Sequence, residues 1–130
     1  MIKTNGLVHM MIPVSDTARS LEFYCGLLGL ELIADHGHLV FCRSGDDFIL
    51  LGKFEVPIKS NVGDDHRIHQ AFHVSDAEYD FALALFKEKG IRVFKEELRD
   101  KDVFVGRSAY FHDPDRNVIE IHASNRHLPA

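Results

Sequence analysis

LVHMMIPVSD at residues 7–16 returns as RIHQAFHVSD at residues 67–76, a shift of 60 residues. Each copy places a histidine, His9 or His69, five residues before a Val-Ser-Asp sequence. Self-similarity at a fixed period indicates a fold that is built from repeated structural units. The chain is therefore predicted to contain two copies of one module.

A helical pattern follows each copy of the repeat, because apolar residues recur at the i, i+3, i+4, i+7 spacing of one helix face. In the second copy Ser75 and Glu78 form a capping box, and Gly90 ends the predicted helix. In the first copy Gly26 and Gly29 mark the helix end and the turn. The apolar positions are Leu21, Tyr24, Cys25 and Leu28 in the first copy and Tyr79, Ala82, Leu83 and Phe86 in the second.

Strand-like runs follow each predicted helix and are separated by Gly, Asp and Pro. Each half therefore reads β-α-β-β-β, and the predicted fold class is α+β. We predict a single domain over residues 1–130, made of a first module at about 5–54 and a second at about 66–125. Their curved sheets are expected to surround a cleft, with the helices outside and residues 54–66 as linker. The predicted strands after the helices are 30–34, 38–43, 47–53, 91–95, 108–112 and 117–123.

Composition excludes several classes of function. The formal net charge is −5 and basic residues are scattered, which argues against nucleic acid and anionic membrane as partners. No apolar run approaches the roughly 20 residues of a membrane span, and residues 1–16 do not read as a signal peptide. A cytoplasmic location is the resulting expectation. Cys25 and Cys42 form no C-x-x-C pair, and Cys25 is expected to be a buried small hydrophobe rather than a reactive thiol.

Strand alternation suggests where a site forms. His9 on the first strand, His69 on its repeat and Glu120 on the last strand each lie on one strand face with their i±2 neighbours, and a shared cleft would bring them together. Two imidazoles and a carboxylate are a known metal-binding set that suits Fe, Mn, Ni, Co or Zn. A structural histidine or a solvent-facing glutamate would explain any one of these residues. Histidines at matched positions of both halves favour one divalent metal ion.

Two motifs carry a family resemblance over nearly the whole chain. The first half has His9, then Val-Ser-Asp at 14–16, SLEFY at 20–24 and Leu-Gly-Leu at 28–30. The second half ends in YFHDPDRNVIEI at 110–121, with Arg116 where the family usually has glycine. With these motifs the chain resembles the vicinal oxygen chelate superfamily of glyoxalase I, bleomycin resistance proteins, extradiol dioxygenases and fosfomycin thiol transferases.

The resemblance implies a metal site and an assembly. His9, His69 and Glu120 match the metal ligands, and His73 is a supporting residue or a fallback ligand. Glu120 and Tyr110 are the expected catalytic residues, while Tyr110, Ser108, Met11 and His73 are the expected contacts to a small-molecule substrate. His122 is a further candidate to support Glu120. Two-module members of this superfamily usually form homodimers, often with metal sites between subunits.

The implied reaction is chelation of a small oxygenated substrate by the metal, which acts as a Lewis acid in a lyase, isomerase, transferase or dioxygenase. Leu50 at the position equivalent to Glu120 argues against glyoxalase I. Met11 in place of a threonine and the offset Arg126 argue against a fosfomycin-type thiol transferase. The absence of a histidine between 73 and 112 argues against an extradiol enzyme, unless His66 or His73 takes the acid-base role. The transferase and a metal-free, ligand-sequestering resistance protein remain the alternatives.

Overall fold

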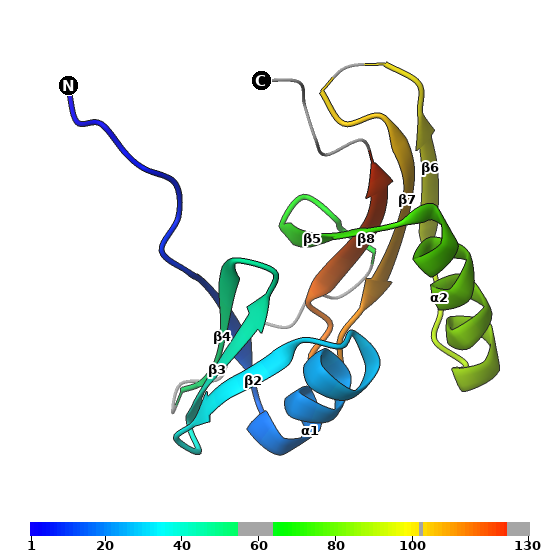
Figure 1. Cartoon of the computed structure of the whole chain (residues 1–130). Coiled ribbons are helices and arrows are strands. Elements are labelled where there is room, and N and C mark those ends of the chain that lie inside the picture. Colours follow the sequence, from blue (N-terminus) through cyan, green and yellow to red (C-terminus); the bar gives the residue numbers. More distant parts are fainter. Residues whose placement is uncertain (55–63, 102, 125–130) are drawn as a thin grey trace. The chain divides into compact units, whose positions relative to one another are not determined.

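The computed structural model describes residues 1–54, 64–101 and 103–124, and it divides into two compact units, Met1–Ser60 and Asn61–Ala130 (Figure 1). Each unit holds a four-stranded sheet and helical structure in the order β-α-β-β-β. The predicted α+β class and the duplicated module are thus confirmed. Most of the predicted linker, at 55–63, and Arg126 lie outside the described residues.

The first unit forms a mixed sheet with the strand order β1-β4-β3-β2. β1 runs parallel to β4, while β4, β3 and β2 form an antiparallel meander. His9, expected on the first strand, lies just before it, because the first paired residue is Met10. The elements are β1 (Met10–Val14), α1 (Thr17–Leu21), η1 (Glu22–Leu27), β2 (Glu31–Asp35), β3 (Leu39–Ser44) and β4 (Asp47–Lys53).

The first helix changes its winding part-way, which the sequence pattern did not predict. Asp16 caps α1 by accepting a hydrogen bond from the Arg19 backbone at 3.1 Å. From Glu22 the helix continues as the π-helix η1, in which the Leu28 backbone N–H donates to the Phe23 carbonyl at 3.0 Å. Gly26 therefore lies inside helical structure rather than at its end.

Two cysteines meet where the first helix packs on its sheet. The Sγ atoms of Cys25 and Cys42 are 3.7 Å apart. Burial, the nearby Cys25 and the charge of Asp35 raise the pKa of the Cys42 thiol to about 12, so this thiol is neutral at physiological pH. Cys25 is half-buried, somewhat more exposed than expected from its apolar helix stripe.

The second unit repeats the topology with the strand order β5-β8-β7-β6. Its helix begins with the predicted cap, since Ser75 Oγ accepts from the Glu78 backbone at 3.1 Å. It ends as predicted at Gly90, whose φ of 69° is a left-handed conformation that glycine adopts without strain. The elements are β5 (His69–Val74), α2 (Asp76–Lys89), β6 (Lys95–Arg99), β7 (Gly106–His112) and β8 (Val118–Ser124).

The strand predicted at 91–95 is wrong, because β6 lies four residues later. Ile91 still belongs to the helix end, where its N–H donates to the Phe86 carbonyl at 2.8 Å. The sequence of β6, Lys-Glu-Glu-Leu-Arg, has little strand propensity. It forms a strand because it pairs in register with β7, from Lys95 opposite Tyr110 to Arg99 opposite Gly106.

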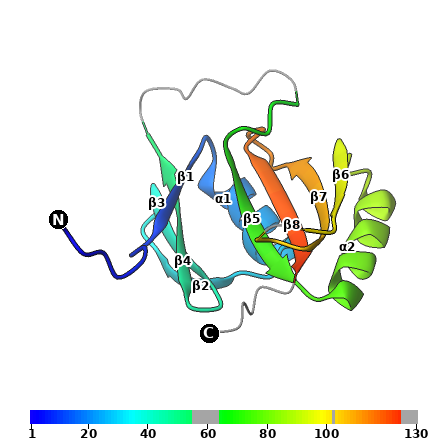
Figure 2. The same cartoon turned by 90° about the horizontal axis from the view of Figure 1, so that it is seen from above.

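The second sheet has one apolar and one polar face. Phe86 of α2 packs on Phe111 of β7 with ring centroids 4.5 Å apart, and the buried Ala109, Ile119 and Ile121 alternate with the polar positions. Figure 2 shows α2 beside this sheet. Burial of this apolar face stabilises the unit and fixes which residues point the other way. The helices in the described part of the chain are too short and too polar to cross a membrane.

Candidate metal and substrate site

Strand register lines up the polar residues of the second sheet in rows. Tyr110 of β7 lies opposite Glu120 of β8 and opposite Lys95 of β6. In the next row, Ser108 lies opposite both His122 and Glu97. Directly opposed residues on neighbouring strands point to the same face. The face that α2 leaves uncovered therefore carries a cluster of ionisable and hydroxyl groups.

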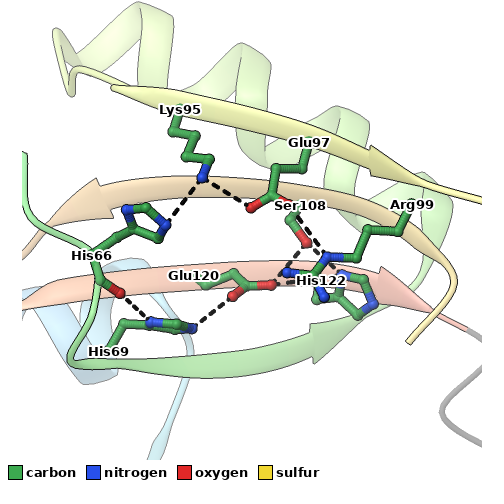
Figure 3. Close-up of polar contacts among 8 residues, drawn as sticks. All are labelled: His66, His69, Lys95, Glu97, Arg99, Ser108, Glu120 and His122. Carbon is green, nitrogen blue, oxygen red and sulfur yellow. Dashed lines mark hydrogen bonds and ion pairs between the residues drawn. The ribbon is translucent and has the colours of Figure 1, made fainter. Parts of the chain in front are cut away.

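His69 and Glu120 are in direct contact at the centre of this face. His69 Nε2 lies 3.0 Å from Glu120 Oε1 (Figure 3). The other ring nitrogen, Nδ1, lies 2.6 Å from the backbone carbonyl of His66, which can only accept a hydrogen bond. Nδ1 therefore carries a proton, and in neutral His69 the lone pair of Nε2 faces a carboxylate oxygen.

This donor pair fits a divalent metal ion. Two electron-rich atoms that face each other at this distance repel unless a proton or a cation lies between them. Neighbouring donors about 2.1 Å from one octahedral ion are about 3.0 Å apart, which matches the observed separation. The His66 carbonyl acts like the outer groups that fix the tautomer of metal-binding histidines. The His69 side chain is 29% exposed, so an ion and a substrate can reach it.

Ser108 connects Glu120 to His122. Its hydroxyl donates to Glu120 Oε2 at 2.8 Å and lies 2.5 Å from His122 Nδ1. Because the hydroxyl proton is used on Glu120, Nδ1 of His122 is the donor in the second contact. His122 Nε2 is then an acceptor, and it is buried without a hydrogen-bond partner among the described residues. Ser108, predicted to contact substrate, is fully buried and holds the carboxylate in the structure.

Tyr110 lies between two carboxylates. Burial raises the pKa of its hydroxyl far above the usual value, and Glu120 and Glu97 raise it further through charge and hydrogen bonds. The phenol therefore stays protonated across the physiological pH range. A phenol with one proton can donate to only one carboxylate at a time, or to a bound substrate oxygen.

A charged row on β6 was not predicted from the sequence, and it contacts His66, which lies three residues before the start of β5. Lys95 Nζ lies 3.0 Å from His66 Nε2 and 3.4 Å from Glu97 Oε1 (Figure 3). Arg99 Nε lies 3.2 Å from Glu97 Oε2. The only signal for this row was the placement of Lys95, Glu97 and Arg99 at alternate positions, which becomes meaningful only once the segment is known to be a strand.

The other predicted site residues occupy defined strand positions. Met11 pairs with Leu50 across β1 and β4, just as Ala71 pairs with Glu120 across β5 and β8. Leu50 is therefore equivalent to Glu120, as predicted, and the register also matches Phe41 to Tyr110. Met11 is 40% exposed.

His9 and His73 complete the set of predicted residues. His9 comes just before β1, at the position equivalent to His69, and is exposed, while His73 is an exposed residue of β5 opposite His122. Over residues 1–54, 64–101 and 103–124, no three or more His, Cys, Asp or Glu side chains are grouped closely enough to hold a metal ion. The roles of His9 and His73 stay predictions.

Comparison with known proteins identifies the family. The model of the Glyoxalase/Bleomycin resistance protein/Dioxygenase superfamily matches residues 6–121. The chain belongs to this superfamily. The resemblance drawn from the His9 and Glu120 motifs is thus confirmed, and with it the general class of metal-dependent enzyme.

Fosfomycin resistance proteins and a metallothiol transferase are similar to this superfamily member. FosX of Listeria innocua is 29% identical over 121 residues, which cover 92% of this chain and 90% of that protein. The metallothiol transferase FosB of Staphylococcus epidermidis is 28% identical over 120 residues, or 92% and 84%. A structure of mutant Listeria monocytogenes FosX with Mn(II) and 1S,2S-dihydroxypropylphosphonic acid covers 93% of this chain and 91% of that chain, with 24% identity and a TM-score of 0.74.

Proposed function

We propose that the protein is a divalent-metal-dependent enzyme that binds adjacent oxygen atoms of a small molecule, with His69 and Glu120 as two of its metal ligands and His9 as the third. The observation that carries the proposal is the His69–Glu120 contact, in which the His66 carbonyl turns the Nε2 lone pair toward a carboxylate at 3.0 Å. A divalent ion bound there supplies Lewis-acid polarisation of a substrate oxygen.

The residues around the pair can bind and orient such a substrate. The Tyr110 hydroxyl remains protonated and donates a hydrogen bond beside Glu120. Lys95 and Arg99 add positive charge on β6, the strand next to Tyr110 on β7. His122 is buried and supports Glu120 through Ser108. Met11 and His73 remain proposed substrate contacts.

We favour addition of a nucleophile to a small electrophile over oxidation by dioxygen. Of the similar proteins named above, FosB is a metallothiol transferase and FosX is a fosfomycin resistance protein. A FosX mutant was crystallised with Mn(II) and a dihydroxypropylphosphonic acid. Water or a thiol would be the nucleophile. The replacement of threonine by Met11 and the offset of Arg126 argue against fosfomycin itself as the substrate, so fosfomycin serves as a reference compound in activity tests.

Metal content tests the proposal. Wild-type protein purified anaerobically should hold one divalent ion per chain by elemental analysis. Loss of a group that supports a metal ligand weakens metal binding by about 10–100-fold. His69→Ala and Glu120→Gln each remove a proposed ligand itself and should weaken binding by more than that. The exposed His38, changed to alanine, is the matched control and should retain the metal. Wild-type protein that binds no divalent ion, or a Glu120→Gln variant that binds as tightly, contradicts the proposal.

We also propose a homodimer in the cytoplasm. Each chain supplies one carboxylate of the Glu120 type, in the same unit as His69. In a dimer, His9 of one subunit could complete the metal site of the other. Size-exclusion chromatography with light scattering should give twice the 14.8 kDa chain mass.

A further inference from the structure

The edge strand β6 presents three charged side chains to the site. Lys95, Glu97 and Arg99 occupy alternate positions, so they share the strand face that carries Tyr110 and Ser108 on β7. The remaining two residues of this stretch, Glu96 and Leu98, point to the opposite face and are exposed. Lys95 and Arg99 thus lie on the face of β6 that borders the proposed substrate site, together with Glu97.

The Glu97 carboxylate accepts the contacts of the donors in this row. Its Oε1 lies 3.4 Å from Lys95 Nζ and its Oε2 lies 3.2 Å from Arg99 Nε (Figure 3). The Tyr110 hydroxyl also donates a hydrogen bond to Glu97. Burial alone would raise the pKa of Glu97, but the hydrogen bonds from Tyr110 and Lys95 and the charges of Lys95 and Arg99 lower it overall. Glu97 is therefore an anion at neutral pH.

An ammonium, a guanidinium and a phenol are the donors that proteins use to bind phosphate and phosphonate groups. A bound oxyanion beside Glu120 would have to compete for these donors with a carboxylate of the protein. The Glu97 side chain is only 21% exposed, so solvent screens its charge less than it screens a surface carboxylate. Lys95 and Arg99 contribute two positive charges, and the negative charge of Glu97 reduces the net charge of the row to +1.

We propose that Glu97 is a specificity-determining residue, which occupies the oxyanion-binding donors Lys95, Arg99 and Tyr110 and so selects against substrates with a doubly charged phosphonate or phosphate group. The proposal deepens the proposed function, since it rests on the site beside Glu120 being the substrate site. The group that the wild-type enzyme accepts at this position is neutral or singly charged.

The test compares Glu97→Gln with Glu96→Gln. Both variants remove one negative charge from neighbouring positions of β6, but only Glu97 faces the cations. Binding of inorganic phosphate and of methylphosphonate to the full chain is measured by calorimetry at pH 7.5 after removal of metal with EDTA. Glu97→Gln should bind both probes at least about 5-fold more tightly than wild type, a change on the scale of one local charge pair. Glu96→Gln should match wild type.

A second variant links the gain to its cause. Adding Arg99→Gln to Glu97→Gln should return phosphate binding to the wild-type level, and circular dichroism should show that all variants are folded. Equal phosphate binding by Glu97→Gln and wild type, or an equal gain in Glu96→Gln, overturns the proposal. Because these measurements use metal-free protein, they are independent of the metal content of His69→Ala and Glu120→Gln, which tests the proposed function.

Discussion

Ser108 is the residue through which the protein can set the geometry of Glu120. Its hydroxyl fixes one carboxylate oxygen at 2.8 Å, which leaves the other oxygen, Oε1, turned toward His69. A metal-binding carboxylate that is held by a buried hydrogen bond loses less freedom when the ion binds. If Glu120 binds the metal as proposed, we expect the serine to contribute to metal affinity without touching the ion.

Ser108→Ala should weaken divalent-metal binding by about 10-fold while leaving the protein folded, because Glu120 becomes free to rotate. The dissociation constant for Mn²⁺ can be measured by calorimetry and folding by circular dichroism. Ser20→Ala is the matched control, since Ser20 is also fully buried and its hydroxyl has no hydrogen-bond partner among the described residues. Equal Mn²⁺ affinity in the two variants would show that Ser108 does not position Glu120.

At the scale of elements, the turn between β7 and β8 sets the register on which the site depends. The buried Asp113 carboxylate accepts hydrogen bonds from the backbones of Asp115 and Asn117, at 2.9 and 2.8 Å, and from the Asn117 side chain at 2.9 Å. Arg116, where related sequences usually have glycine, adopts a left-handed φ of 64° in this turn. The turn thereby places Tyr110 opposite Glu120.

Asp113→Ala should lower the free energy of unfolding by about 2–3 kcal/mol, because three partly buried donors lose a buried, charged acceptor. Urea denaturation followed by circular dichroism measures the change. Asp46→Ala, at an exposed position in the turn between β3 and β4, should change stability by less than about 0.5 kcal/mol. Similar midpoints for both variants would mean that Asp113 does not hold the turn.

Elements with a hydrophobic period were predictable, and elements set by pairing were not. The spacing of Tyr79 and Phe86 and the caps at Ser75 and Gly90 defined α2 from the sequence alone. β6 was misplaced because four of its five residues are charged and its strand conformation comes from its pairing with β7. The predicted site lacked the β6 residues for the same reason. Glu120 and Tyr110 stood in a recognisable motif, but Lys95, Glu97 and Arg99 gained meaning only from the register.

At the scale of the whole molecule, the two units have the same strand topology but different functional side chains. The parallel pair β1–β4 and its equivalent β5–β8 have matching registers, which place Leu50 where the second unit has Glu120. Phe41 likewise stands where the second unit has Tyr110. Leucine and phenylalanine cannot bind a metal ion or donate a proton. The first unit can supply His9 but no equivalent carboxylate, so each chain is expected to bind one metal ion and not two.

If His9 completes the site of a second subunit, variants that lack different ligands should rescue each other. His9→Ala and His69→Ala homodimers should each bind metal weakly. After the two are unfolded together and refolded, half of the dimers are mixed, and each mixed dimer has one site with all its ligands and one site that lacks two. Tight Mn²⁺ binding should then return to about one quarter of the wild-type sites. If His9 and His69 serve a site within one chain, every site in a mixed dimer still lacks one ligand, and mixing restores nothing.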